Sequence, residues 1–341
     1  MKAMILERLC NIRENPLPLK LIDWPTPEPK EHEILIKVSS CGVCHTELDE
    51  IEGRTPPLHL PVIPGHQVVG TVVDMGRQVS TIKIGERVGV AWIFSACGIC
   101  RFCLTGRENL CSAFVATGRD SNGGYAQFMT VREDFAYLIP SGFSDLQAAP
   151  LLCAGAIGYR SLMLAGIING QRLGLTGFGA SAHLVLKMAR YLYPDTEVFV
   201  FARNVEERIF AQALGAVWVG DTFEHAPVKL DSIIDTTPAW EPVVEALANL
   251  ESGGRLVINA IRKEDDRRCL LNLDYSVHLW QEKELKTVAN ITRSDVKQFL
   301  KLGADMNIQP EVEVYDLDQA NKALFELKTG TVKGAKVLRI N

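Results

Sequence analysis

No run of this sequence approaches the ~20 consecutive apolar residues that a membrane-spanning helix needs. The first residues, MKAMILERLCNIRENP, lack the long apolar core of a secretory signal peptide. Basic residues are not in excess, because Lys and Arg total 36 against 41 for Asp and Glu, and the net charge is −5. These absences argue against a membrane partner, secretion and a nucleic-acid partner, and they predict a cytoplasmic protein.

What the sequence does contain is typical of a soluble globular protein. The apolar fraction is 47% and the charged fraction is 23%. A chain of 341 residues is too long for one ordinary core and suits two domains. Because the cytoplasm keeps thiols reduced, closely spaced cysteines there favour a metal site over disulfides.

Four of the nine cysteines form a tight cluster in the run CGICRFCLTGRENLC. Four thiolates at such short spacings predict a closed tetrahedral zinc site, which is structural. Disulfides or free thiols are the competing interpretations. The cluster consists of Cys97, Cys100, Cys103 and Cys111.

A second group of metal-type residues is scattered along the chain. It comprises Cys44 in GVCHTE, His66 in PGHQ and Cys153 in LLCAG. Two sulfurs and one imidazole leave the fourth position of a zinc ion open, and an open position is where chemistry occurs. Each residue is a weak signal by itself, because a lone cysteine is most often a small buried apolar residue.

The pattern along the chain changes twice. Residues 1–153 contain short β-branched runs, such as HEILIKVSS and VVGTVVDMG, separated by Gly and Pro. Residues 154–290 alternate between strands and helices, which predicts a parallel sheet with helices on both faces. Residues 291–341 read as helix, strand, helix and strand. The charged stretch RKEDDRR, residues 262–268, is interpreted as a solvated loop.

The first strand of the alternating part ends in a glycine-rich turn of the form GxGxxA. A helix follows it, so the turn predicts a dinucleotide site in which the pyrophosphate lies at the helix N-terminus. The competing interpretation is a tight strand–helix turn without a ligand. The candidate cofactor residues are Gly177, Phe178, Gly179, Ala180 and Ser181.

The next strand ends without the acidic residue that would bind the ribose of NAD. The sequence there is Phe201, Ala202, Arg203 and Asn204. Arg203 can pair with a 2′-phosphate as a forked donor, and the alternative is an ordinary solvated arginine. The loss of the acid and the gain of the base both favour NADP over NAD.

These motifs occur in an order that resembles the zinc-dependent alcohol dehydrogenases of the medium-chain dehydrogenase/reductase family. The resemblance spans essentially the whole chain. It implies a GroES-like catalytic domain in residues 1–153, completed by the tail at 291–341. A Rossmann domain for NAD(P) in residues 154–290 is then inserted between them.

The resemblance also implies roles for individual residues. Cys44, His66 and Cys153 would hold the catalytic zinc, and the four clustered cysteines the structural zinc. Thr46 matches the hydroxyl that touches the substrate oxygen, and His45 matches a residue that approaches the cofactor pyrophosphate. Glu47 matches an acid that orients the metal-bound histidine. Cys41 lies three residues before Cys44 and mimics a CxxC pair, but it matches no ligand position.

Three positions depart from the family pattern. Gln67 replaces the usual Glu after the metal-binding His, which leaves the site more positive. Asp49 stands where a His often relays the proton to solvent. Ala335 occupies the position of a basic residue that often binds pyrophosphate, and Lys333 or Lys336 is expected to compensate.

The expected activity is reversible oxidation of a small alcohol to an aldehyde or ketone, with two zinc ions per subunit, in a homodimer or homotetramer. Trp92 matches a bulky residue of the substrate pocket, or is a core residue. Ile51 and Thr55 replace large aromatics of ethanol enzymes, which predicts a roomier pocket. The alternatives are a zinc polyol dehydrogenase, a cinnamyl-type aldehyde reductase and, more remotely, a non-catalytic scaffold that binds nucleotide and zinc.

Overall fold

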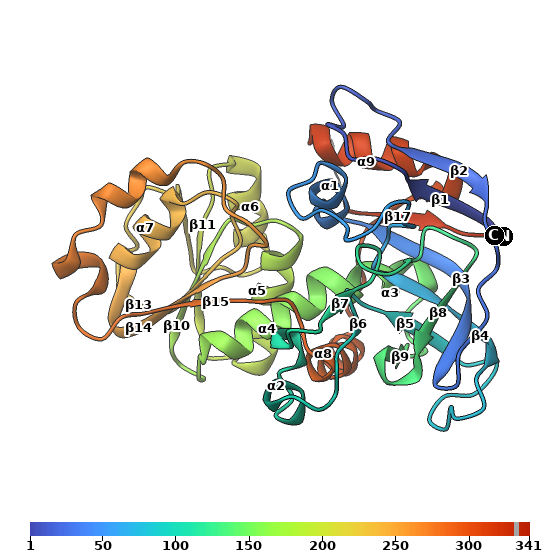
Figure 1. The fold of residues 1–341 in the computed structure, drawn as a ribbon. Coiled ribbons are helices and arrows are strands. Elements are labelled where there is room, and N and C mark those ends of the chain that lie inside the picture. Colours follow the sequence, from blue (N-terminus) through green and yellow to red (C-terminus); the bar gives the residue numbers. More distant parts are fainter. Residues whose placement is uncertain (331–333) are drawn as a thin grey trace. The chain divides into compact units, whose positions relative to one another are not determined.

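The computed structural model describes residues 1–330 and 334–341. The chain folds into two compact units (Figure 1). The first unit comprises Met1–Ala156 and Ile291–Asn341, and the second comprises Ile157–Asn290. The predicted fold class, a β-rich part together with a doubly wound parallel sheet, is confirmed.

The first unit is built mainly from short strands. Its main sheet has the order β16-β17-β3-β4-β5-β9, and β8 also pairs with β3. The tail strand β17 pairs antiparallel with β3, so the C-terminal segment is an integral part of this unit (Figure 1). The strands are β1 (Lys2–Leu6), β2 (Leu19–Asp23), β3 (Glu33–Val43), β4 (Val68–Met75), β5 (Arg87–Val90), β6 (Ile93–Ser95), β7 (Val115–Ala116), β8 (Phe128–Arg132), β9 (Ala136–Leu138), β16 (Val312–Asp316) and β17 (Ala335–Arg339).

Short helices connect these strands and close the unit. Helix α8 begins with a capping box in which Thr292 and Asp295 satisfy each other's backbone N–H groups. Helix α9 ends at Gly330, whose φ of 84° is left-handed. The helical elements are α1 (His45–Ile51), α2 (Arg101–Leu104), η1 (Glu108–Leu110), η2 (Glu133–Phe135), α3 (Asp145–Pro150), η3 (Leu151–Gly155), α8 (Arg293–Asp305), η6 (Leu317–Gln319) and α9 (Ala320–Thr329).

Among the residues that the structure describes, one helical stretch, Asp145–Ala165, is long and apolar enough to cross a membrane by length and composition alone. Gln147, Arg160 and Ser161 interrupt this stretch, so it is not a run of ~20 consecutive apolar residues. It contains 21 residues, and 61% of its apolar window is buried inside the protein. Burial of this extent is typical of a core helix in a globular protein, so the stretch gives only weak support for a membrane span.

Within residues 157–290, all of which the structure describes, six parallel strands form one sheet. Their order is β12-β11-β10-β13-β14-β15, so the chain reverses direction across the sheet between β10 and β13. Strands β10, β11 and β13 are largely buried, as a sheet covered by helices requires, whereas the edge strand β15 is exposed. They are β10 (Arg172–Thr176), β11 (Glu197–Phe201), β12 (Trp218–Gly220), β13 (Leu230–Asp235), β14 (Leu250–Ile258) and β15 (Glu284–Thr287).

The helices of the second unit bury apolar faces against this sheet. Helix α7 packs on β13 and β14, where its Val243 and Leu247 join the buried Ile233 and Leu256. Helix α5 also has a buried apolar face, which includes Val185, Leu186 and Met188. The helical elements are α4 (Ala156–Ala165), which starts at the boundary between the units, α5 (Ala180–Leu192), α6 (Val205–Ala213), α7 (Glu241–Asn249), η4 (Arg267–Asn272) and η5 (Tyr275–Leu279).

Strand β17 carries a fully buried lysine, with the side chain of Lys336 at 0% exposure. Its ammonium donates to Glu313 and Glu326, at 2.8 Å each, and to the Tyr315 hydroxyl at 2.5 Å. Burial lowers a lysine pKa, but these contacts outweigh burial and raise the pKa of Lys336. Lys336 is therefore engaged within the first unit and not free to bind a phosphate; Lys333 lies outside the described residues.

We expect Lys336→Met to destabilise the β16–β17 region by about 3 kcal/mol. This loss of stability lies at the low end of the range for breaking a buried ion pair, because Glu313 and Glu326 stay partly exposed. Hydrogen exchange of the β17 amides measures it. Lys322→Met is the matched control, because Lys322 is 62% exposed and lies 4.0 Å from Glu326, so its loss should cost less than about 1 kcal/mol. Equal losses of stability in the two variants would contradict the prediction.

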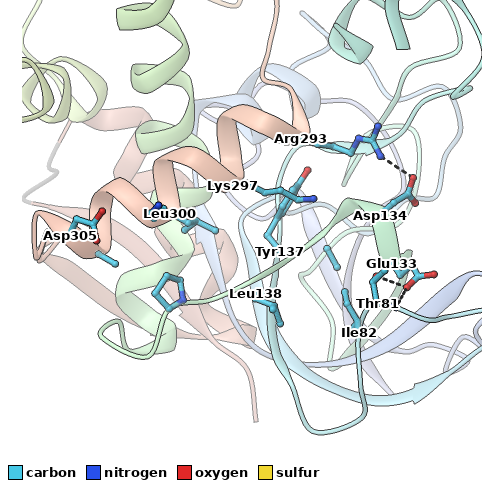
Figure 2. Close-up of a pocket in the computed structure, with 14 residues that line it drawn as sticks. Thr81, Ile82, Glu133, Asp134, Tyr137, Leu138, Arg293, Lys297, Leu300 and Asp305 are labelled. Atoms are coloured by element: carbon cyan, nitrogen blue, oxygen red, sulfur yellow. Dashed lines mark hydrogen bonds and ion pairs between the residues drawn. The ribbon is translucent and has the colours of Figure 1, made fainter. Parts of the chain in front are cut away.

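A cleft of about 570 Å³ lies in the first unit between β9, η2 and α8 (Figure 2). Arg293 on α8 forms ion pairs with Glu108 and Asp134 at its rim. The Tyr137 hydroxyl is buried there without a hydrogen-bond partner among the described residues, and burial raises the pKa of Tyr137. None of the predicted zinc or cofactor residues lines this cleft, so it is separate from the predicted chemistry.

Candidate functional site

Cys44 lies at the corner where β3 turns into α1. It is the N-cap of α1, and its backbone N–H donates to Glu47 Oε2 at 2.8 Å in a capping box. Glu47 is fully buried, whereas His45, the first residue of the helix, is exposed. The strand before Cys44 and the capping bond after it therefore hold the thiol on a rigid corner.

His66 lies in the turn before β4. The preceding Gly65 has a φ of 99°, and a Cβ there would stand 2.4 Å from the Tyr125 ring, so only glycine fits. The His66 Nδ1 atom lies 2.5 Å from Glu47 Oε1, which fixes the ring tautomer. Its Nε2 atom is buried and has no hydrogen-bond partner among the described residues. A buried polar atom without a partner calls for a ligand.

Cys153 lies in η3, a single π-helical turn between α3 and α4. Such turns frequently occur at functional sites because they shift the register of side chains along a helix. A Cβ at Gly155 would stand 2.1 Å from the Phe299 ring, so a glycine here lets η3 pack closely on α8. This packing fixes the position of the Cys153 thiol within the first unit.

The structure brings the three scattered candidates together. Ligand atoms of Cys44, His66 and Cys153 all lie within 4.8 Å of one another, and the two sulfurs are 3.9 Å apart. A tetrahedral zinc ion with Zn–S bonds of ~2.3 Å places its sulfur ligands ~3.8 Å apart. Together with the unpartnered His66 Nε2, this geometry fits a zinc ion held by three protein ligands.

The protonation of these ligands is strongly coupled. A hydrogen bond from Cys153, opposed by burial and assisted by His66, lowers the pKa of Cys44 well below its usual range. The same bond, with burial, raises the pKa of Cys153. Burial lowers the pKa of His66, but the charges of Glu47 and Cys44 and the bond to Glu47 outweigh it and raise that pKa. A metal ion must displace these protons, so metal affinity falls as the pH falls.

Polar side chains surround the three ligands. The Thr46 hydroxyl lies 3.6 Å from the Cys44 sulfur. Gln67 is buried against Gly42, where a Cβ would stand 2.2 Å from its amide oxygen. Asp49 accepts a hydrogen bond from Arg54 Nε at 2.5 Å. Its carboxylate is thus held in an ion pair.

Glu50 is a buried acid near the site that sequence reasoning missed. It is 2% exposed and accepts a hydrogen bond from the Trp92 indole at 3.3 Å. Burial, with the Glu47 charge, raises its pKa well above the usual range. The Arg119 guanidinium lies 5.2 Å from the Trp92 ring centre, so Trp92 is held from two sides. The sequence feature that could have identified Glu50 is the position of an acid on the buried face of α1.

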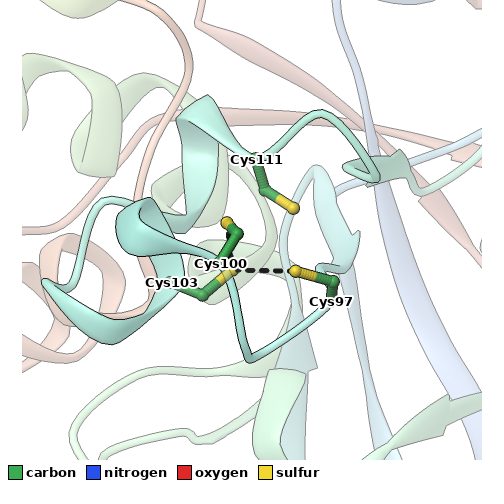
Figure 3. Close-up of side chains that lie close together, drawn as sticks. All are labelled: Cys97, Cys100, Cys103 and Cys111. Carbon is green, nitrogen blue, oxygen red and sulfur yellow. Dashed lines mark hydrogen bonds between the residues drawn. The ribbon is translucent and has the colours of Figure 1, made fainter.

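The four clustered cysteines converge in the loop at residues 97–111 (Figure 3). Cys103 lies 3.8 Å from Cys97 and 3.6 Å from Cys100, sulfur to sulfur, and all four sulfurs lie within 4.8 Å of one another. These separations match the ~3.8 Å edge of a tetrahedral zinc–thiolate site. Backbone N–H groups of Ile99 and Cys100 lower the pKa of Cys97 to about 6, whereas burial raises that of Cys103 to about 12.

The predicted glycine turn joins β10 to α5 in the second unit. Gly177 has a φ of 75°, and a Cβ there would stand 2.9 Å from Thr237. Gly179 is the N-cap of α5, and nothing lies within 4 Å of its Cβ position. Phe178 is buried, and the Ser181 hydroxyl accepts a hydrogen bond from Asn259. Open space before an uncapped helix N-terminus fits a pyrophosphate; Ala180 is the first residue of this helix.

The end of β11 lies beside this turn, because β10 and β11 are neighbours in the sheet. Arg203 is exposed and has no hydrogen-bond or ion-pair partner within residues 1–330 and 334–341. Asn204 caps α6, accepting a hydrogen bond from the Glu206 N–H at 2.8 Å. The Arg203 guanidinium is thus free for a phosphate, while the Asn204 side-chain oxygen is already used.

Comparison with known proteins agrees with this arrangement. Residues 30–141 match the family model of the alcohol dehydrogenase GroES-like domain. The chain is 42% identical over 328 residues to a probable alcohol dehydrogenase AdhA of Mycobacterium tuberculosis, covering 95% of this chain and 93% of the relative. It is 30% identical over 331 residues to an alcohol dehydrogenase of Geobacillus stearothermophilus, covering 94% and 96%.

A solved structure shares the whole architecture. A cinnamyl alcohol dehydrogenase of Sorghum bicolor, SbCAD4, matches with a TM-score of 0.83 and 26% sequence identity, covering 99% of this chain and 97% of that chain. The predicted GroES-like character of the first unit is confirmed by the family model, and the two-part fold by the structural match.

Proposed function

Because this chain belongs to the zinc-dependent alcohol dehydrogenases of the medium-chain dehydrogenase/reductase family, we propose that it catalyses the reversible oxidation of an alcohol to an aldehyde or ketone, with hydride transfer to NAD(P)⁺. The observation that carries the proposal is the convergence of Cys44, His66 and Cys153 from three distant segments. The buried His66 Nε2, which has no partner among the described residues, supports a metal ion at this point.

The three converging residues would hold a catalytic zinc, and the four clustered cysteines would hold a structural zinc, giving two ions per subunit. A zinc with an open position lowers the pKa of a bound hydroxyl and polarises a carbonyl. Glu47 would orient His66 through its Nδ1 atom and Cys44 through its backbone N–H. Its charge also makes His66 a stronger ligand.

The Thr46 hydroxyl is the group of this chain best placed to take the substrate proton, because it lies beside the Cys44 sulfur. We propose that the proton then passes toward the cofactor ribose and solvent without Asp49. The ion pair with Arg54 keeps the Asp49 carboxylate occupied, so a relay through it would have to break that pair.

We propose that the cofactor binds across the glycine turn, with NADP favoured over NAD. The pyrophosphate would lie at the N-terminus of α5, against Gly179. His45, which is exposed, stays a candidate cofactor residue on the basis of the family resemblance. Arg203 would bind the 2′-phosphate, because it is exposed and unpaired at the end of β11.

Arg203→Ala should raise the KM for NADP on the order of 10–100-fold, since a hydrogen bond to a charged group contributes about 1.5–3 kcal/mol. The KM for NAD should change little, because NAD has no 2′-phosphate. Steady-state kinetics with both cofactors measures the difference. Arg208→Ala is the matched control, because Arg208 on α6 pairs with Asp221. Equal loss for both cofactors would rule out the 2′-phosphate role of Arg203.

We propose a longer-chain or aromatic alcohol as substrate, because Ile51 and Thr55 leave a roomier pocket than large aromatics would. One structural relative is named a cinnamyl alcohol dehydrogenase. We expect kcat/KM to rise by about tenfold or more from ethanol to benzyl and cinnamyl alcohol, since one methylene in an apolar pocket contributes about 1–3 kcal/mol. A strong preference for ethanol would refute the roomier pocket, and a preference for sorbitol would favour a polyol dehydrogenase.

Turnover with these alcohols and aldehydes, together with metal analysis, also tests the function itself. Absence of turnover with every alcohol and aldehyde, by a protein loaded with two zinc ions, would favour a non-catalytic scaffold instead. Because the relevant thiols must remain reduced to bind metal, we propose that the enzyme acts in the cytoplasm.

We also propose a homodimer or homotetramer. All four residues of the edge strand β15 are exposed, which leaves its backbone free to pair with another chain. Apolar side chains are exposed in the segment just before it, which favours a contact between copies; they include Leu271, Tyr275, Val277 and Trp280. Sedimentation equilibrium of the zinc-loaded protein measures the assembly state.

A further inference from the structure

A buried ion pair lies at the edge of the second unit where the cofactor turn is found. Parallel strands β10 and β13 are neighbours at the point where the strand order reverses, and ligands of such sheets bind beyond the strand ends at that point. The last residue of β13 is Asp235, which is 0% exposed. It accepts hydrogen bonds from the Thr176 and Thr237 hydroxyls, at 2.7 Å each, and from the Lys263 ammonium.

Lys263 uses all three of its ammonium protons at this point. Besides the ion pair with Asp235, it donates to the backbone carbonyls of Thr237 at 2.8 Å and Ala239 at 2.9 Å. Its side chain is 9% exposed, and the ammonium lies 5.9 Å from the Trp240 ring centre. The interpretation of residues 262–268 as a solvated loop is therefore wrong for Lys263.

The segment that Lys263 holds forms one wall of the glycine turn. The Thr236 N–H donates to the Thr176 carbonyl at 2.9 Å, and its hydroxyl donates to the same oxygen at 3.0 Å. Both Thr236 and Thr237 stand so close to Gly177 that a Cβ there would lie 3.0 and 2.9 Å from them. Any displacement of residues 236–239 thus changes the shape of the turn.

We infer that Lys263 is a positioning residue for the nicotinamide dinucleotide. It clamps the carbonyls of Thr237 and Ala239 to Asp235, and so holds Thr236 and Thr237 against the turn at Gly177. The inference rests on the proposed function, because it assumes that the dinucleotide binds at this turn. An ordinary structural ion pair would stabilise the fold without affecting the cofactor beyond what the stability loss explains.

The test measures NADPH affinity without substrate, by the fluorescence of the bound cofactor, together with thermal stability. In Lys263→Met the dissociation constant should rise on the order of tenfold, since residues of one network couple by such amounts. The melting temperature should fall, because Asp235 is left buried and unpaired. Lys283→Met is the matched control: Lys283 donates to the carbonyls of Leu247 and Val277, away from the turn, and its loss should leave NADPH affinity unchanged.

The double variant Lys263→Met/Asp235→Asn separates positioning from stability. It removes the uncompensated charge, so the melting temperature should return toward that of the wild type. The affinity for NADPH should stay weak, because the carbonyls of Thr237 and Ala239 remain unclamped. Affinity that recovers in step with stability, or that never changes in Lys263→Met, would overturn the inference alone. A wild-type protein that binds neither NADPH nor NADH would contradict the proposed function as well.

Discussion

Cys44→Ser is expected to abolish alcohol-dependent NADPH formation, with a loss in kcat of at least about 1,000-fold, because a zinc ion contributes several kcal/mol of transition-state stabilisation. The thiol is one of three converging ligand atoms, and its low pKa makes it the thiolate of the Cys44–Cys153 pair. A serine hydroxyl stays protonated and binds zinc poorly. Zinc content should therefore fall by one ion per subunit.

The variant should still bind NADPH, because the glycine turn belongs to the second unit and Cys44 to the first. Cofactor fluorescence and metal analysis, measured on the same preparation as activity, separate loss of chemistry from loss of fold. Cys10→Ser serves as the control, because Cys10 is only half-buried and its sulfur accepts one hydrogen bond from Asn15. A Cys44→Ser enzyme that keeps both zinc ions and its turnover would exclude Cys44 as a ligand.

The second large effect is expected at the four-cysteine loop. Cys100→Ser should remove the other zinc ion and open the loop at residues 97–111. This loop has little apolar core of its own, since Ile99 is 81% and Leu104 is 73% exposed. Zinc supplies the folding free energy of such segments, about 10–16 kcal/mol in small zinc domains. The loop should therefore lose its structure even where the rest of the unit stays folded.

Trypsin offers a direct measurement, because Arg101 and Arg107 are exposed in this loop. Cleavage after these residues should accelerate about 100-fold or more in Cys100→Ser, since proteolysis follows the population of the locally open state. Treatment of the wild type with a chelator should produce the same cleavage. Unchanged cleavage together with two retained zinc ions would show that the four sulfurs do not form a metal site.

Local signals predicted much of the second unit correctly. The helix expected directly after the glycine turn is α5, Ala180–Leu192, and the alternation expected over residues 154–290 includes α7, Glu241–Asn249. Both have an apolar face at helical spacing, which neighbouring residues alone reveal. The helical stretch Asp145–Ala165 was missed. It contains Pro150 and a π-helical turn at Leu151–Gly155, which interrupt the regular spacing of its side chains.

The catalytic-type group of Cys44, His66 and Cys153 depends on contacts between residues far apart in the sequence. Cys44 and Cys153 are 109 residues apart, and sequence spacing carries no information about such a contact. The family resemblance supplied this pairing, and the structure places the two sulfurs 3.9 Å apart. The family resemblance did not predict the ion pairs of individual side chains, such as the one between Asp49 and Arg54. Those pairings depend on what lies opposite each residue in space.

The sequence by itself determined what depends on near neighbours: four cysteines within fifteen residues, a GxGxxA turn and an alternating pattern of strands and helices. Backbone geometry limits how such close residues can be arranged, so their spacing is enough. Only the tertiary structure decided which charged residues are buried. Lys336 and Lys263 look like ordinary surface lysines in the sequence, yet each is enclosed by oxygen atoms from distant segments. Burying a charge is possible only where such partners meet, and the fold alone brings them together.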